Sequence, residues 1–226
     1  MRIEKGLKGP CFESGYKALA SRGIAVIGMS PGNSYFKQPT IHYLIEFAAK
    51  EFGQVYIWTP DLPAAHTYKA LGYPDQEAKQ KAHSQGNNLK NHSAKAIRTL
   101  EKEYTERCFI MDWNRDIEHS QVYQENLAYV KTLYQSNQEF YNDIHEETRR
   151  VIEGYSRRLQ EATPAALEEG AQYLIKEMAF FLASETLLQS NNVTLLYHRR
   201  WQVFEQFFSG YYDGITRNIG LLIVTI

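Results

Sequence analysis

The sequence predicts an α/β fold in which a mostly parallel central sheet lies between layers of helices. An apolar run at residues 24–29 ends in a Pro-Gly-Asn turn, a helical pattern follows, and a second short run comes at 55–58. Short apolar runs bounded by turn residues are typical of strands buried on both faces, and the order strand, helix, strand implies parallel neighbours. The chain also ends on the strongly apolar sequence LLIVTI at 221–226.

The elements of the first half follow from local signals. A helix over 39–52 is indicated by apolar side chains at helical spacing, and Pro39 suits its first turn. Gly53 stops that helix before the strand at 55–58. The polar stretch 78–107 has its few apolar residues at spacings that fit a solvated helix.

The second half is predicted to add more strands and most of the helices. We expect a strand at 108–113, helices at 120–134, 138–158 and 164–182, a strand-like run at 193–196 and a final strand at 221–226. Because crossover helices pack on both faces of a parallel sheet, the prediction is a Rossmann-like three-layer sandwich.

Length and composition indicate one domain over residues 1–226. Hydrophobic residues make up 43% of the 226-residue chain, enough for one full core, and no linker or repeat divides it. The N-terminus lacks the apolar centre of a signal peptide and no run approaches a membrane span, so we expect a cytoplasmic protein without membrane contact. We also expect a monomer, because no long apolar surface stripe is left over.

Charge and potential metal ligands narrow the function classes. The formal net charge of −1 argues against general affinity for nucleic acid, since phosphate binding draws on clustered Lys and Arg, so any such binding must be local. The 7 histidines and the cysteines Cys11 and Cys108 show no metal-ligand spacing. We therefore predict no metal, no cofactor and two free thiols.

Ser30 is the first candidate nucleophile. It stands where the strand at 24–29 gives way to a turn, and ligands of open α/β sheets bind at such carboxyl ends. Residues 28–32 also match G-x-S-x-G, yet a loop up to Pro39 separates them from the next helix, whereas a hydrolase elbow turns directly into one. The alternative is a serine that only forms a turn.

A carboxylate interrupts a later apolar helix. The segment AQYLIKEMAFFLASETLL is apolar on most of its circumference, yet it contains Glu177. An unpaired buried carboxylate is expensive, so Glu177 must reach a partner, shift its pKa upward or face a cavity. Tyr173 lies one turn earlier, and the two side chains could hold an amino group or pass a proton. The alternative is a helix edge with Glu177 in solvent beside Lys176.

A second strand-like run ends in polar residues. The run 193–196 stops at Tyr197 and His198, much as the first strand stops at Ser30. His198 invites a hypothesis in which it is the base for Ser30, although most histidines have structural roles.

The best local candidate for nucleic-acid binding is a basic segment that contains Lys90, Lys95, Arg98 and Lys102. The last three fall at i, i+3 and i+7, which places them on one face of a continuous helix. The alternative is a solvated face balanced by nearby glutamates.

Three motifs occur in an order and at spacings that resemble the cyclodipeptide synthases. They are GMSPGNSYF at 28–36, YLIKE at 173–177 and LYH at 196–198. The resemblance extends over residues 20–226. Asn33, Tyr197 and His198 make the chain similar to the subgroup whose motif is Asn-Tyr-His.

The resemblance implies a Rossmann-fold enzyme similar to the catalytic domains of class I tyrosyl- and tryptophanyl-tRNA synthetases, but without ATP chemistry. In agreement, neither HIGH nor KMSKS occurs in the chain. Family members take two aminoacyl-tRNAs and make a cyclic dipeptide, a 2,5-diketopiperazine, by a ping-pong route. Ser30 is then expected to carry the aminoacyl and dipeptidyl esters.

The resemblance also implies roles for individual residues. Tyr173 and Glu177 are expected to hold the α-amino group of the bound aminoacyl moiety, with Glu177 a candidate for proton transfer. Tyr197 is expected to assist around the nucleophile, and Gly28 to leave room for the first substrate's side chain. The other expected substrate-binding residues are Val26, Asn33, Tyr123 and His198, and the expected tRNA-binding residues are Lys90, Lys95, Arg98 and Lys102.

Two other functions stay open at this point. One is a serine esterase or acyltransferase that uses Ser30 with free or thioester acyl donors. The other is a non-catalytic, tRNA-binding relative of the synthetases. The synthase is preferred because it alone accounts for Ser30, Tyr173, Glu177 and Tyr197 together.

Overall fold

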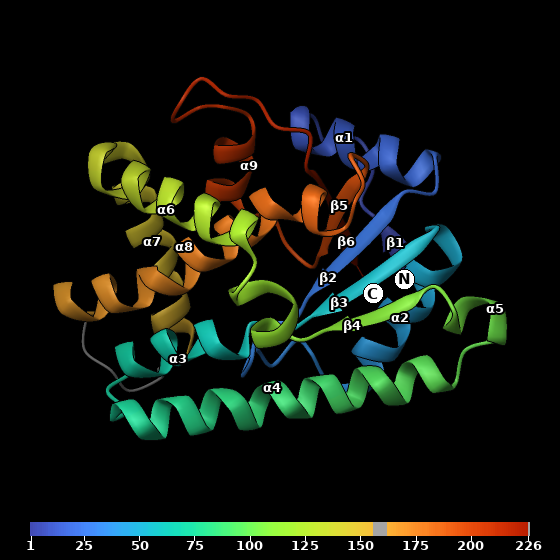
Figure 1. The fold of residues 1–226 in the computed structure, drawn as a ribbon, viewed down its shortest axis with the longest axis horizontal. Coiled ribbons are helices and arrows are strands. Elements are labelled where there is room, and N and C mark those ends of the chain that lie inside the picture. Colours follow the sequence, from blue (N-terminus) through green and yellow to red (C-terminus); the bar gives the residue numbers. More distant parts are fainter. Residues whose placement is uncertain (156–161, 226) are drawn as a thin grey trace.

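The computed structural model describes residues 1–155 and 162–225, and at its centre lies a six-stranded sheet with helices on both faces (Figure 1). The strands are β1 (Arg2–Ile3), β2 (Ile24–Gly28), β3 (Gln54–Trp58), β4 (Cys108–Met111), β5 (Val193–Tyr197) and β6 (Gly220–Thr225). Their order across the sheet is β1-β6-β5-β2-β3-β4, with β1 antiparallel to β6 and the other neighbours parallel. The predicted mostly parallel α/β sandwich is confirmed.

The helices follow the order that the sequence indicated, with several additions. They are α1 (Pro10–Ala20), α2 (Gln38–Glu51), α3 (Asp61–Ala70), α4 (Asp75–Arg98), α5 (Lys102–Thr105), the π-helical turn η1 (Trp113–Glu118), α6 (Gln121–Ser136), α7 (Gln138–Tyr155), α8 (Pro164–Leu187) and α9 (Gln202–Phe208). Helices α1, α3 and α9 are additions to the elements that the sequence predicts. Among these described helices none is long and apolar enough to cross a membrane.

Strand β2 shows how the sheet separates two apolar clusters. All of Ile24–Gly28 is buried, and side chains along a strand point alternately to its two faces. Ala25 and Ile27 belong to the cluster built with α2 and α4, whereas Val26 belongs to the larger cluster built with α6, α8 and α9. The three layers therefore meet at the central strand.

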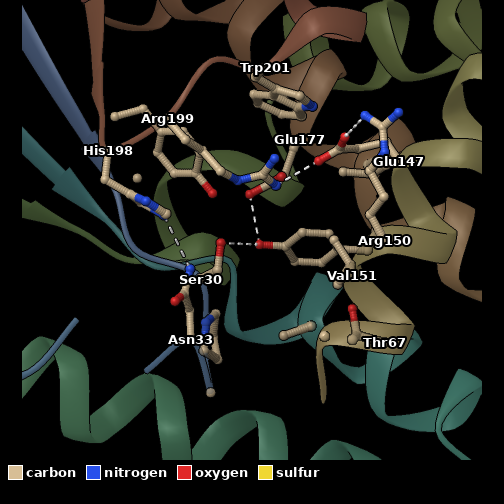
Figure 2. Close-up of a pocket in the computed structure, with 18 of the residues that line it drawn as sticks. Ser30, Asn33, Thr67, Glu147, Arg150, Val151, Glu177, His198, Arg199 and Trp201 are labelled. Atoms are coloured by element: carbon tan, nitrogen blue, oxygen red, sulfur yellow. Dashed lines mark hydrogen bonds and ion pairs between the residues drawn. The ribbon is translucent and has the colours of Figure 1, made fainter. Parts of the chain in front are cut away.

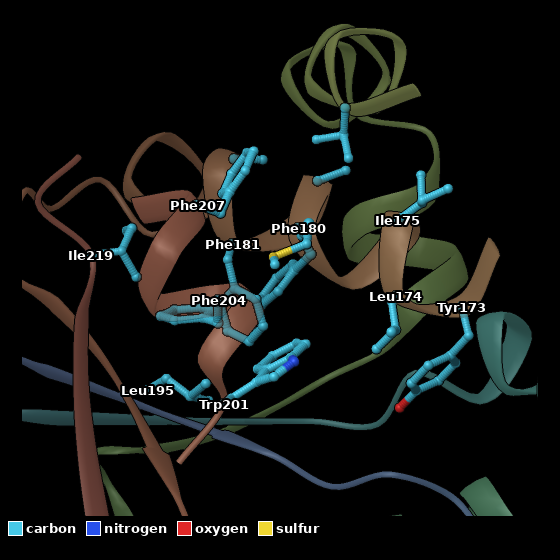
Figure 3. Close-up of a cluster of buried hydrophobic side chains, with 14 of the residues drawn as sticks. Tyr173, Leu174, Ile175, Phe180, Phe181, Leu195, Trp201, Phe204, Phe207 and Ile219 are labelled. Carbon is cyan, nitrogen blue, oxygen red and sulfur yellow. The ribbon is translucent and has the colours of Figure 1, made fainter. Parts of the chain in front are cut away.

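Helix α8 runs through the larger cluster (Figure 3). Thr163 caps its start, where the hydroxyl accepts a hydrogen bond from the backbone N–H of Ala166 at 3.2 Å, and Pro164 occupies the first turn. Phe180 and Phe181 pack on Trp58 of β3. Glu177 is only 7% exposed, so the alternative of a helix edge in solvent is wrong.

Two expected boundaries differ from the structure for local reasons. The strand expected at 108–113 ends at Met111, because the Asp112 side chain accepts a hydrogen bond from the backbone N–H of Arg115 at 3.1 Å and so caps η1. Helix α8 continues to Leu187, past the expected end at 182. The end of the helix expected at 138–158 and the last residue of the strand expected at 221–226 fall outside the described residues.

The basic segment does not form one continuous helix. Helix α4 ends at Arg98, where the Thr99 hydroxyl donates to Ala96 O at 2.6 Å, and Lys102 opens the separate short helix α5. The single helix face expected for Lys95, Arg98 and Lys102 is therefore wrong, because the chain turns between the last two of them.

Candidate active site

The carboxyl ends of the central strands open into a cavity of about 510 Å³ (Figure 2). Strands β2 and β5 are parallel neighbours, with Ile27 beside Leu196, so the residues that follow them lie together. Ser30 after β2 and His198 after β5 both line the cavity, and Tyr173 and Glu177 reach it from α8. Candidates from distant segments thus share one site, as expected for ligands of open α/β sheets.

Ser30, Tyr173 and Glu177 form a hydrogen-bonded chain. The Ser30 Oγ lies 3.0 Å from Tyr173 Oη, which in turn lies 2.8 Å from Glu177 Oε1. The two α8 side chains meet because residues four apart stand on the same helical face. The chain gives the serine hydroxyl a continuous path to a buried carboxyl group.

Burial sets the proton affinity of this chain. Burial raises the pKa of Glu177 to about 8, while the hydrogen bond from Tyr173 and the charge of Arg199 act to lower it. The pKa of Tyr173 is raised well above its ordinary value by burial and by the neighbouring carboxylate. When Glu177 is ionised, Tyr173 donates its one proton to the carboxylate, so its oxygen is free to accept from Ser30.

Tyr197, the last residue of β5, lies beside the hydrogen-bonded residues Ser30, Tyr173 and Glu177. Burial raises the pKa of Tyr197 to about 12, and the charges of Glu177 and Arg199 act on it with opposite signs. Its hydroxyl is thus a neutral donor and acceptor at physiological pH. Tyr197 lines the same cavity as Ser30, as the sequence suggested for both.

His198 is held by the loop after β2 rather than by Ser30. Its ring stacks on Tyr35 at 4.1 Å between centroids, and its Nε2 lies 3.5 Å from Asn33 Nδ2. Asn33 Oδ1 also accepts from the backbone N–H of Tyr35 at 3.0 Å. Burial and the nearby Arg199 lower the pKa of His198 to about 4, so the ring is neutral at pH 7. Asn33 and His198 therefore brace the serine loop.

Two tyrosines, Tyr68 and Tyr155, contact the turn after Ser30. Gly32 has a φ of +83°, and a Cβ there would stand 2.5 Å from Tyr68 Oη, so the position requires glycine. Tyr155 of α7 donates its hydroxyl hydrogen to Pro31 O at 3.0 Å. Ser30 is thus presented from a loop that the protein holds at several points.

The sequence analysis missed three charged residues that line the cavity: Glu147 and Arg150 of α7, and Arg199. Arg199 carries a readable signal, since it directly follows the polar end of the run at 193–196. Glu147 and Arg150 carry none, because charged residues are ordinary on a helix whose packing partners are unknown.

The chain is similar to known proteins over almost its whole length. The model of the cyclodipeptide synthase family matches residues 10–225. The chain belongs to the cyclodipeptide synthase family. Among curated relatives, the cyclo(L-leucyl-L-leucyl) synthase of Bacillus subtilis (strain 168) is 24% identical over 216 residues, which are 90% of this chain and 82% of the relative. Membership makes the chain an enzyme, an aminoacyltransferase, as its motifs implied.

Solved members of the family share the fold. A cyclodipeptide synthase from Bacillus thermoamylovorans has a TM-score of 0.83 at 24% identity, over 93% of this chain and 92% of that one. The Mycobacterium tuberculosis structure that relates cyclodipeptide synthetases to type I tRNA-synthetases has a TM-score of 0.77 at 22% identity, over 99% and 97%. A synthase from Candidatus Glomeribacter gigasporarum, solved bound to Phe-tRNAPhe, has a TM-score of 0.62 at 13% identity, over 90% and 88%.

Gly28 lines the cavity, and its small size also serves the packing of the protein. Its expected role toward the first substrate's side chain stays a prediction. A Cβ at this position would stand 2.9 Å from Trp58 Nε1, so the glycine makes room for an indole of the protein itself. That indole lines the cavity and stacks on Phe180 with centroids 4.2 Å apart. Trp58 therefore forms the part of the cavity wall next to Gly28.

Two other residues that were expected to bind substrate, Val26 and Tyr123, do not line the cavity. Val26 is fully buried in β2 and does not reach the cavity surface. Tyr123 is also fully buried, packs edge-on against Trp113 at 5.5 Å and lacks a hydrogen-bond partner for its hydroxyl among the described residues. Neither side chain is therefore among those that line the cavity, and their expected contact with a substrate stays a prediction.

The basic residues of this family member divide into two kinds. The Lys90 amine is held between Asp61 Oδ2 at 2.8 Å and Asp112 Oδ2 at 2.9 Å, and its side chain is only 17% exposed. Lys95, Arg98 and Lys102 are exposed. The geometry therefore leaves these three as the candidates for contact with tRNA.

Proposed function

We propose that the chain joins two aminoacyl groups, each delivered by a tRNA, into a 2,5-diketopiperazine through esters on Ser30. The observation that supports this best is the hydrogen-bonded chain from Ser30 through Tyr173 to Glu177 at the cavity. The relative solved with Phe-tRNAPhe supports aminoacyl-tRNA as the donor. The contact of Asn33 with His198 supports membership of the Asn-Tyr-His subgroup. We further propose that the protein acts as a monomer in the cytoplasm, where aminoacyl-tRNAs are found.

The first step loads the serine. Ser30 Oγ attacks the carbonyl carbon of the first aminoacyl-tRNA, the bond from that carbon to the terminal ribose oxygen breaks, and the ribose oxygen leaves with a proton. Ser30 gives up its proton toward Tyr173 Oη, 3.0 Å away. The product is an aminoacyl ester on Ser30 and a free tRNA.

The second step needs a free amine. The α-amino group of the seated aminoacyl ester is held by Tyr173 and Glu177, and ionised Glu177 accepts one proton from the ammonium form. The amine then attacks the carbonyl carbon of the second aminoacyl-tRNA, whose ribose oxygen leaves. Attack in the reverse sense, by the second substrate's amine on the Ser30 ester, would instead leave the dipeptide on tRNA.

The last step closes the ring. The free amine of the dipeptidyl ester attacks the ester carbonyl, the bond to Ser30 Oγ breaks, and the serine recovers a proton through Tyr173. Tyr197 stands beside the nucleophile as a neutral hydroxyl and assists this exchange. No outside oxidant, reductant or nucleotide enters the balance.

A direct test is to incubate the purified protein with one aminoacyl-tRNA and weigh the intact protein by mass spectrometry. We expect a covalent adduct of aminoacyl mass on the unaltered chain and none on Ser30→Ala. The control Ser34→Ala, in the same loop, should still carry the adduct. Coexpression of the same variants in a bacterium, with mass spectrometry of the medium, identifies the cyclic dipeptide and its two amino acids.

The outcomes separate the rival functions. Turnover of a simple activated ester without tRNA would indicate the esterase or acyltransferase. Binding of tRNA that survives Ser30→Ala, with no adduct on either protein, would indicate the non-catalytic relative. A diketopiperazine that is absent with Ser30→Ala supports the synthase.

A further inference from the structure

The cavity wall next to Glu177 carries an ion pair between a buried carboxylate and a partly exposed arginine, which the proposed steps do not use (Figure 2). Glu147 of α7 is 4% exposed, and its Oε1 accepts a hydrogen bond from Arg199 Nη2 at 2.6 Å. Its Oε2 lies 3.5 Å from Arg150 Nη1. Because a buried carboxylate must be paired, Glu147 fixes where the Arg199 guanidinium points.

Arg199 also connects this pair to the reacting residues. Its guanidinium lies 6.0 Å from the centre of the Tyr197 ring, and Figure 2 shows its side chain extending across the cavity toward both glutamates. Glu177 accepts its hydrogen bond from Tyr173, and within residues 1–155 and 162–225 it forms no ion pair. A positive charge therefore stands beside Glu177 without binding it.

We propose that Arg199 is a positioning residue for Glu177, held in place by Glu147, which keeps a positive charge close to the Glu177 carboxylate while leaving that carboxylate open to an amino group. The proposal rests on the proposed function only in naming an amino group as the ligand. The arrangement itself is a property of the free enzyme.

A positive charge that lies near Glu177 without pairing with it has an advantage over both a direct ion pair and no nearby charge. With no positive charge nearby, the pKa of a carboxyl group buried in an apolar wall rises further, so a smaller fraction of it is ionised and ready to accept a proton from an ammonium group. With a direct ion pair, its lone pairs would be occupied by the guanidinium and the substrate would have to displace it. Because Glu147 binds the Arg199 guanidinium, the positive charge favours the ionised form of Glu177 while the Glu177 oxygens stay free for an amino group.

The charges that face Glu177 come from every element packed around it. Arg199 follows β5, Glu147 and Arg150 come from α7, and the neutral hydroxyls of Tyr173, Tyr197 and Ser30 complete the surroundings. Arg199 acts to lower the pKa of Glu177 and Glu147 acts to raise it. The two residues should therefore move that pKa in opposite directions when each is neutralised.

The test is a titration of Glu177 in the free enzyme by NMR, with glutamate labelled by ¹³C at the side-chain carboxyl carbon and Glu177→Gln used to assign the signal. We expect Arg199→Gln to raise the pKa of Glu177 by about one pH unit and Glu147→Gln to lower it. Arg199→Lys, which keeps the charge, should stay close to the unaltered protein. Arg150→Gln, which removes the other partner of Glu147, is the matched control and should shift the pKa least.

The design stays decisive if a single variant folds poorly. Removing one partner of a buried pair is destabilising, whereas removing both charges is often tolerated. The double variant Glu147→Gln/Arg199→Gln should return the pKa of Glu177 toward its starting value. Equal pKa values in Arg199→Gln, the double variant and the unaltered protein would overturn the proposal.

A kinetic readout then links the charge to turnover. The low-pH limb of kcat/KM should move to higher pH in Arg199→Gln and stay in place in Arg199→Lys, whereas a purely structural role would lower the rate without moving the limb. The substrate amine titrates alike with every variant, so only differences between variants count. If no variant makes a diketopiperazine, the proposed function fails while the NMR titration still decides this inference.

Discussion

Tyr173 and Glu177 stand one turn apart on α8, and the tyrosine hydroxyl lies 2.8 Å from the carboxylate Oε1. Both side chains are almost fully buried. Burying a carboxyl group with one hydrogen-bond partner lowers the stability of the fold, so its presence in an apolar helix indicates a functional role. In the proposed function, the hydrogen bond from Tyr173 to Ser30 gives the carboxyl group a role in proton transfer, and the first two predictions follow from it.

Removal of the Tyr173 hydroxyl should interrupt the chain while preserving the ring. We expect Tyr173→Phe to reduce diketopiperazine formation by about 100-fold or more, since proton transfer by a positioned group contributes at least that much. Initial rates with purified aminoacyl-tRNA measure the effect. Tyr212→Phe is the control, because it loses a buried hydroxyl bonded to Asp143 at 2.6 Å, away from the cavity. An equal loss of rate in that control would attribute the effect to folding.

The raised pKa of Glu177 predicts a pH-dependent cost to stability. The ordinary pKa of 4.5 rises to about 8 on folding, so between these values the native state keeps a proton that the unfolded chain releases. Stability contributed by this group therefore falls as pH rises through that window, by up to about 1.4 kcal/mol per pH unit. We expect Glu177→Gln to gain stability over the unaltered protein from pH 5 to pH 8. Urea unfolding at several pH values measures the difference, and two parallel stability curves would contradict it.

The sequence was a good guide wherever one local pattern decided the outcome. The strand before Ser30 and the apolar helix around Glu177 are encoded by hydrophobic periodicity alone, and so both could be placed. Strand ends placed Ser30 and His198 at one edge of the sheet, and helical spacing paired Tyr173 with Glu177. The hydrogen bond between Tyr173 and Ser30 could not be predicted from these patterns, because it depends on how α8 packs in the fold. The Glu147–Arg199 pair could not be predicted, because it depends on how α7 packs against α8 and α9. The close contact of Gly28 with Trp58 could not be predicted either, since nothing in the sequence shows that the indole of the next strand lies against the glycine.

The close approach of Gly28 to Trp58 predicts a strong steric coupling. In Gly28→Ala the new Cβ would stand 2.9 Å from Trp58 Nε1, and the indole is already stacked on Phe180. We expect a loss of about 1–3 kcal/mol in the free energy of unfolding, as for other overpacked cores. Trp58→Phe in the same chain should recover part of it. Gly154→Ala, where a Cβ meets nothing within 4 Å, is the matched control and should be neutral or stabilising.

The split of the basic segment predicts two separate phenotypes. Lys90 neutralises the buried Asp61, whose side chain is 6% exposed, so Lys90→Ala should destabilise the fold by about 3 kcal/mol. Thermal unfolding measures that loss. An unchanged melting temperature would show that Lys90 is free for another role.

Lys95 and Arg98 are exposed at the end of α4, and reversing them to Glu should leave the melting temperature in place while weakening the use of aminoacyl-tRNA. The physical reason is counterion release: the slope of log affinity against log salt falls by about one for each phosphate that the protein no longer neutralises. We therefore expect the variant to differ most from the unaltered protein at low salt and to converge with it as salt rises. Lys131→Glu, an exposed reversal on α6, is the control for a charge reversal elsewhere on the surface, and it is compared with the single variant Lys95→Glu so that the net charge changes equally. The same weakening in that control would make the effect one of overall charge, and unchanged use of aminoacyl-tRNA in both variants would place the tRNA on another face.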